Sequence, residues 1–149
     1  MPSFPGVAKT LATGLAAEHG VEISILPHKF DPVLAKIGNK LSLKNGGLDC
    51  RQCHAVGQEK PSGDHNTQIA LGINFVQVRE RMRHDFFSRF VLDPPRFEVS
   101  TKMPKLATDG RTTKIRTHYD GDAARQFEAL WNFIQSLEAS DAGSSRPND

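Results

Sequence analysis

The chain has 149 residues, with 19 Lys and Arg against 17 Asp and Glu and a formal net charge of +2. This length predicts one compact domain and is too short for two independent cores. An apolar share of 38%, which does not count 12 Gly, excludes disorder throughout. The small net charge excludes the basic footprint that nucleic-acid binding requires, and no run approaches the roughly 18 apolar residues of a membrane span.

The first 30 residues predict a linker or N-terminal extension. Helical periodicity is weak there, and Val21, Ile23 and Ile25 alternate with polar residues as in a short strand. Pro2 and Pro5 interrupt the apolar run that a signal peptide would need. We therefore expect residues 1–30 to lie outside the main domain.

A first helix is predicted directly after Asp31. Aspartate is a good N-cap, and Pro32 suits the first helical position. Apolar residues then recur on one face for about three turns, until Asn45-Gly46-Gly47 ends the helix. The main domain is expected to begin here and to extend over residues 31–138.

Cys50 and Cys53 are the two cysteines of the chain, and His54 follows directly. One such pair closes too small a loop to stabilise a fold as a disulfide, and no second CxxC or HxxxH completes a structural zinc site. The spacing is that of c-type haem attachment. In a helical turn all three side chains project from neighbouring surface, so two thiols can reach the porphyrin edge while the imidazole reaches the iron.

His54 is therefore the predicted proximal ligand of one covalent haem c. Its second ring nitrogen should donate a hydrogen bond to a carbonyl, which fixes the tautomer and tunes the basicity of the ligand. Pro61, in the polar loop that follows the motif, is the candidate for that carbonyl. Because this haem is attached outside the cytoplasm, the motif predicts a periplasmic or otherwise exported protein. The segment is then expected to belong to a longer exported chain, whereas the alternative is a cytoplasmic protein with an unused motif.

A second helix is predicted over about 76–92, where phenylalanines form an apolar stripe that ends at Asp93-Pro94-Pro95. Possible sixth ligands of the iron are Met82, Met103, His65, His84 and His118. Met82 falls inside this predicted helix, where a methionine usually fills core space. Met103 precedes Pro104 in an extended loop that can place its thioether over the ring, which favours Met103.

A last helix is predicted after Gly121-Asp122, with Phe127, Leu130, Trp131 and further apolar residues at helical spacing up to Leu137. Residues 139–149 predict a flexible tail, because they are polar and contain Gly, Ser and Pro.

Several motifs of residues 31–137 form one pattern: Cys50-Arg51-Gln52-Cys53-His54, Asn74-Phe75 with Val78, Arg81 and Met82, Phe86-Phe87, Leu92-Asp93-Pro94-Pro95, Lys102-Met103-Pro104 and Gln126-Phe127-Glu128-Ala129-Leu130-Trp131. On these residues the segment resembles a class I cytochrome c domain, and more narrowly the domain near the C-terminus of multidomain planctomycete-type haem proteins. The resemblance implies an all-α cytochrome c fold and iron ligation by His54 and Met103. It also implies that the first and last helices cross at Gly38, against Phe127 or Trp131. Phe75 and Trp131 are expected to help bind the haem.

The expected function is one-electron transfer without catalysis by this segment, because a low-spin iron with both axial positions filled has no site for substrate. The partners would be a donor or acceptor redox protein, or a dehydrogenase domain of the same polypeptide. The alternative is a haem enzyme, or a sensor reactive toward a gas or peroxide, in which the distal position is open.

Overall fold

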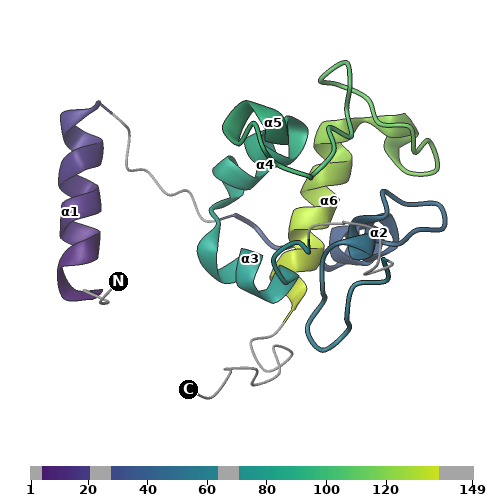
Figure 1. The fold of residues 1–149 in the computed structure, drawn as a ribbon, viewed down its shortest axis with the longest axis horizontal. Helices are drawn as coiled ribbons and strands as arrows, with labels where there is room; N and C mark the ends of the chain where they lie inside the picture. The colour runs from purple at the N-terminus through teal and green to yellow at the C-terminus, as the bar shows by residue number, and fades with distance from the viewer. Residues whose placement is uncertain (1–4, 21–27, 64–70, 138–149) are drawn as a thin grey trace.

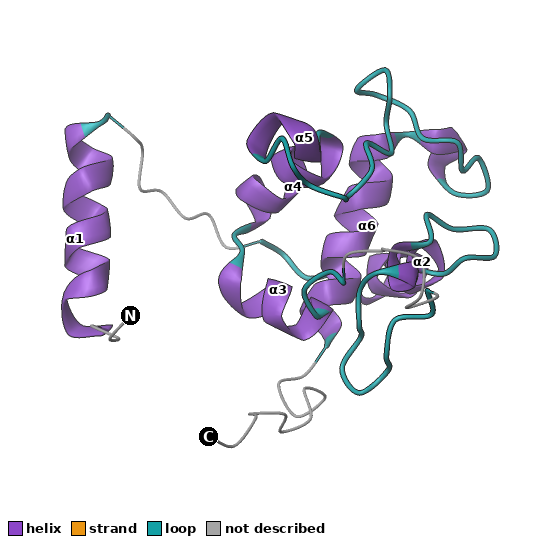
Figure 2. Cartoon of the chain, viewed as in Figure 1, coloured by secondary structure: helices purple, strands orange, loops and turns teal. Residues whose placement is uncertain are grey.

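The computed structural model describes residues 5–20, 28–63 and 71–137. Within them the chain forms six α-helices and no β-strand, so the expected all-α class is confirmed (Figures 1 and 2). The helices are α1 (Pro5–Glu18), α2 (Pro32–Ser42), α3 (Phe75–Arg81), α4 (His84–Leu92), α5 (Pro94–Phe97) and α6 (Ala123–Ser136). The strand predicted at 21–25, His65 and the tail predicted at 139–149 lie outside the described residues.

The core forms where α6 meets α2, α3 and α4 (Figure 1). Helix α6 begins at its N-cap Asp122, whose side chain accepts a hydrogen bond from the Arg125 N–H. Its apolar side chains repeat at helical spacing and are buried, as the sequence predicts. The buried cluster contains Leu41, Phe75, Val78, Phe87, Val91, Ala107, Ala123, Phe127, Ala129, Leu130, Trp131, Phe133 and Ile134.

Helix α2 begins as predicted, and Asp31 is its N-cap. The Asp31 carboxylate accepts hydrogen bonds from the backbone N–H groups of Val33 (2.7 Å) and Leu34 (3.2 Å). These groups have no partner inside the helix, so the cap satisfies donors that the first turn leaves open.

Gly38 lies at the crossing of α2 and α6, as predicted, but its neighbours there are different. A Cβ at this position would lie 1.9 Å from the carbonyl oxygen of Ala129 and 2.8 Å from the Cβ of Phe133. The contact therefore involves the α6 backbone at Ala129, rather than the predicted Phe127 or Trp131. Small residues at both positions allow the two helix backbones to approach this closely.

The prediction of a single helix over 76–92 is wrong, because α3 and α4 are separate helices. Met82 (φ −107°, ψ 146°) and Arg83 (φ −90°, ψ 150°) have extended backbone between them. Both helices pack against α6. The apolar pattern of two short helices that face the same core looks continuous in the sequence, so it does not show the change of direction.

The structure also contains a helix, α1, within the N-terminal segment for which weak helical periodicity was expected. This segment is rich in Ala and contains Leu11 and Leu15, and both residue types have high helix propensity. Val7, Leu11 and Leu15 repeat every four residues and are all exposed. Figure 1 shows α1 apart from the other helices. The helix therefore follows from local propensity rather than from a strong apolar face.

Candidate functional site

A cavity of about 320 Å³ lies beside α3, α4 and α6. It brings together Cys50, Cys53, His54, Phe75 and Met103, which the sequence analysis selected from separate parts of the chain. The remaining lining is mainly apolar and includes Leu48, Leu71, Ile73, Val78, Met82, Phe87, Phe90, Val91, Leu106, Leu130 and Ile134. An apolar cavity with few convergent ligand atoms is the usual form of a cofactor site.

The Cys-x-x-Cys-His motif forms a helical turn, as predicted, in the form of a 3-10 helix (Cys50–Gln52). The Cys50 carbonyl accepts hydrogen bonds from the N–H groups of Cys53 (3.2 Å) and His54 (3.0 Å). Asp49 precedes the turn in the left-handed region (φ 59°). Neither cysteine is in a disulfide, so both thiols are available for other chemistry.

The imidazole of His54 is held through its Nδ1, which lies 2.8 Å from the Ile73 carbonyl oxygen. A carbonyl only accepts, so Nδ1 carries the proton and Nε2 keeps a free lone pair. The prediction that the Pro61 carbonyl accepts this hydrogen bond is therefore wrong. Gly72 allows the backbone to lie against the ring, because a Cβ there would be 2.4 to 2.7 Å from three ring atoms of His54.

The backbone segments on either side of this contact are joined by further hydrogen bonds. The Gly72 N–H donates to the Cys53 carbonyl (2.7 Å), and the Phe75 N–H donates to the Ala55 carbonyl (3.0 Å). The Asn74 amide exchanges two hydrogen bonds with the Gly57 backbone, at 2.8 Å and 3.1 Å. The carbonyl that orients His54 is thus fixed by its neighbours on both sides.

The surroundings keep these groups neutral near pH 7. Burial lowers the pKa of His54, although the hydrogen bond to Ile73 acts in the opposite direction. Burial raises the pKa of the Cys50 thiol to about 12, and burial together with the charge of Asp49 raises the pKa of Cys53. A neutral imidazole with a free Nε2 is the form that binds a metal ion.

Two thioethers, those of Met103 and Met82, line the cavity. Met103 lies in the loop between α5 and α6, and its backbone N–H donates to Thr101 Oγ1 (3.2 Å). Met82 lies in the extended link between α3 and α4, so a place within a helix no longer argues against it. His84 and His118 are not among the residues that line this cavity.

Trp131 is buried but does not line the cavity. Its ring lies 5.0 Å from that of Phe87 and 5.6 Å from that of His84, measured between centroids. In the described part of the structure its indole Nε1 is buried without a hydrogen-bond partner. It is therefore separate from the group of ligand atoms around His54.

Gly72 was not identified by the sequence analysis, and Ile73 was not selected as a partner of His54. Their contribution is made by backbone, a carbonyl in one case and the absence of a Cβ in the other. The one signal that the sequence offers is Asn74, a residue that often caps helices, directly before the helix that begins at Phe75.

The donor set fits a haem c: two unpaired thiols, one neutral imidazole and a thioether meet at one mainly apolar cavity. No protein-family model, curated protein or solved structure matches the chain. Among the helices that the structure describes, none is long and apolar enough to cross a membrane.

Proposed function

We propose that this chain is a one-electron transfer domain with one covalently bound haem c and the cytochrome c fold. The observation that carries the proposal is the meeting of Cys50, Cys53, His54 and Met103 at one cavity. When bound, haem c supplies reversible one-electron oxidation and reduction at its iron. The two thiols would hold it as thioethers, and His54 Nε2 would bind the iron.

Other residues of the cavity support this role by fixing the ligands and excluding water. The Ile73 carbonyl fixes the tautomer and direction of His54. With a haem bound, the apolar lining from α3, α4 and α6 would limit its contact with water, which favours the less charged state of a redox centre.

We infer that Met103, rather than Met82, would be the second protein ligand of the iron. Met103 lies in the loop that carries the Lys102-Met103-Pro104 sequence on which the resemblance to class I cytochromes rests, and Pro104 disfavours helical backbone at Met103. A histidine and methionine pair gives a higher reduction potential than two histidines. With both positions filled, the domain would exchange electrons without binding substrate.

The proposal includes the cellular setting. Attachment of haem to reduced thiols outside the cytoplasm requires export of the chain. The electron partner would be a separate redox protein that forms a small transient interface, or a dehydrogenase domain of the same polypeptide, for which tethering replaces diffusional encounter.

The test of haem attachment is to express the chain with an export signal in a bacterium that matures c-type cytochromes. The intact mass should increase by one haem, and the reduced protein should show a low-spin c-type spectrum. A Cys50→Ser/Cys53→Ser variant should carry no covalent haem. An unmodified mass for the exported parent chain, in a strain that matures a control cytochrome, would overturn the proposal.

The axial assignment is tested separately with Met103→Ala and its matched control Met82→Ala. The ferric parent protein should show the weak near-infrared band of methionine ligation, and its ferrous form should not bind carbon monoxide. Met103→Ala should lose the band and bind carbon monoxide, whereas Met82→Ala should retain the parent behaviour. The reverse result would assign the ligand to Met82. A parent protein that lacks the band and binds carbon monoxide in its ferrous form would indicate an open distal position.

A further inference from the structure

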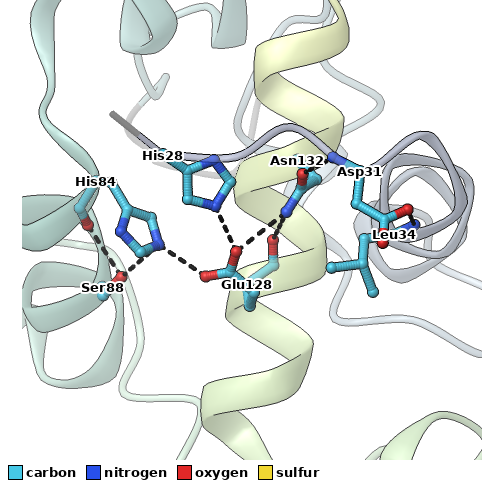
Figure 3. Close-up of polar contacts among 7 residues, drawn as sticks. All are labelled: His28, Asp31, Leu34, His84, Ser88, Glu128 and Asn132. Atoms are coloured by element: carbon cyan, nitrogen blue, oxygen red, sulfur yellow. Dashed lines mark hydrogen bonds and ion pairs between the residues drawn. The ribbon is translucent and has the colours of Figure 1, made fainter. Parts of the chain in front are cut away.

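A second group of metal-ligating side chains lies outside the cavity (Figure 3). His28 comes from the segment before α2, His84 is the first residue of α4, and Glu128 lies in α6. The Nε2 atom of His28 is 2.5 Å from Glu128 Oε1, and that of His84 is 2.7 Å from Glu128 Oε2. One potential ligand atom from each residue lies within 4.8 Å of the other two.

Asn132 fixes this group from one side. It is fully buried, and its Nδ2 donates to Glu128 Oε1 (3.1 Å) and to the Glu128 carbonyl (2.9 Å). Its Oδ1 accepts a hydrogen bond from the Asp31 N–H (2.7 Å), which ties the segment that carries His28 to α6. Figure 3 shows these contacts leading from Asp31 to the Glu128 carboxylate. Carboxylates that bind metal ions are usually held in place by such hydrogen bonds.

Neighbouring side chains also restrict the two imidazoles. The rings of His28 and His84 are 4.4 Å apart between centroids, and Trp131 lies 6.2 Å and 5.6 Å from them. Ser88 Oγ donates to the His84 carbonyl (2.9 Å) and lies 3.5 Å from His84 Nε2. The side chain of His28 is only 16% exposed, whereas those of His84 and Glu128 are 35% exposed. An ion can therefore reach the group from the solvent.

The chemistry of these ligands selects a class of metal. Two imidazoles and a carboxylate suit Zn²⁺ and other divalent transition ions, whereas Mg²⁺ and Ca²⁺ require oxygen ligands. Zinc bonds to nitrogen and carboxylate oxygen are about 2.0–2.2 Å long, so a small outward movement of the imidazoles would admit an ion. In the structure each Nε2 carries the proton that it donates to the Glu128 carboxylate. To bind an ion, each imidazole would carry its proton on Nδ1 instead, which frees the Nε2 lone pair.

We propose that His28, His84 and Glu128 form a binding site for Zn²⁺, with one coordination position open to water. The site joins three parts of the chain that are distant in sequence, and an ion there would lock the segment before α2 onto α4 and α6. It is separate from the cavity around His54 and does not depend on haem attachment.

The test is a titration of the full chain, as purified and after chelator treatment, with ZnCl₂ against a competing chelator. One equivalent should bind with a dissociation constant below about 1 μM at pH 7. X-ray absorption at the zinc edge should show nitrogen and oxygen neighbours at about 2.0–2.1 Å and no sulfur at about 2.3 Å. A sulfur shell would place the ion at Cys50 and Cys53 and overturn the proposal, as would the lack of binding at that affinity.

Variants assign the ligands. His28→Gln, His84→Ala and Glu128→Gln should each weaken zinc binding by at least about tenfold, whereas the control His118→Ala should not. Zinc should raise the melting temperature of the parent chain but not of His84→Ala, and Mg²⁺ should raise neither. If the parent and His84→Ala chains both melt cooperatively and bind zinc with equal affinity, His84 is not a ligand. The three residues then form only a hydrogen-bonded cluster, and the proposal is overturned. Failure of haem attachment would not alter these readouts.

Discussion

At the scale of single residues, Asn74 links α3 to Gly57, which follows the Cys-x-x-Cys-His motif. Its Oδ1 accepts from the Val76 N–H (3.1 Å) as the cap of α3, and also from the Gly57 N–H (3.1 Å). Its Nδ2 donates to the Gly57 carbonyl (2.8 Å). The residue directly before it, Ile73, orients His54. One side chain therefore satisfies backbone groups of two segments at once.

Asn74→Ala should lower the free energy of unfolding by about 2 kcal/mol, because it removes a helix cap and leaves two Gly57 groups without their partner. Asn74→Asp is the matched control. It keeps the oxygen that accepts from the Val76 and Gly57 N–H groups, but its second carboxylate oxygen faces the Gly57 carbonyl in place of the lost donor. Because the helix cap remains, it should be less destabilising than Asn74→Ala. Urea denaturation of both variants measures the difference, and equal stabilities of Asn74→Ala and the parent would contradict this role.

Asp109 provides a second prediction at this scale, on pH. Its carboxylate accepts hydrogen bonds from Thr112 Oγ1 (2.5 Å), the Thr112 N–H (2.6 Å) and the Arg111 N–H (2.8 Å). These hydrogen bonds lower the pKa of the Asp109 carboxyl from 3.8 to about 2, and the bond from the Thr112 hydroxyl has the largest effect. The folded state therefore binds the proton less readily than the unfolded state does.

For a carboxylate with a lowered folded-state pKa, the stabilisation is complete above the unfolded pKa and is lost as the pH falls through the folded one. The parent chain should therefore be more stable than Asp109→Asn near pH 6. The difference in stability between the two chains should decrease between pH 4 and pH 2. Thermal melts of both chains across this range, with an NMR titration of the Asp109 carboxyl, measure the effect. A difference in stability that stays constant down to pH 2 would contradict the lowered pKa of Asp109.

At the scale of elements, the closest contact is that of α2 with α6. Gly38 faces the backbone carbonyl of Ala129, and a backbone atom cannot move aside as the end of a flexible side chain can. The two helices provide the largest share of helix–helix contact in the described chain. Their separation is therefore fixed by the absence of one Cβ.

Gly38→Ala should destabilise the fold by about 3 kcal/mol, at the upper end of overpacking effects, although Ala is a better helix former than Gly. Gly14→Ala is the matched control, because Gly14 also lies within a helix and a Cβ there would meet nothing within 4 Å. That control should be neutral or slightly stabilising. A Gly38→Ala chain as stable in urea as the Gly14→Ala chain would show that the helices separate freely.

At the scale of the whole molecule, the buried cluster is built from α2, α3, α4, α6 and the loop before α6. The apolar residues Val7, Leu11 and Leu15 of α1 are instead exposed. His28 and Asp31, by contrast, both contact α6 through hydrogen bonds.

Deletion of residues 1–20 should consequently change the melting temperature by less than about 2 °C, since none of the side chains that the structure describes in this segment is buried. Deletion of residues 1–31 should lower it by several degrees, because it also removes the His28 contact and the Asp31 cap of α2. Calorimetry of the two truncated chains distinguishes them. A large loss on removal of residues 1–20 alone would mean that α1 contributes to the core.

The sequence by itself determined the features that depend on residues close together in the chain. The cap at Asp31, the turn at Cys50–Gln52 and the apolar face of α6 were all predicted, because each follows from local hydrogen bonding or helical spacing. The break between α3 and α4 was missed, since both helices bury apolar residues against the same core.

Only the tertiary structure decided which distant groups meet. The carbonyl that binds His54 is 19 residues away, and His28 and Glu128 are 100 residues apart. Such contacts involve backbone atoms or polar side chains that leave no periodic pattern in the sequence. They depend on how α2, α3 and α4 pack against α6, and that arrangement is set by the whole core.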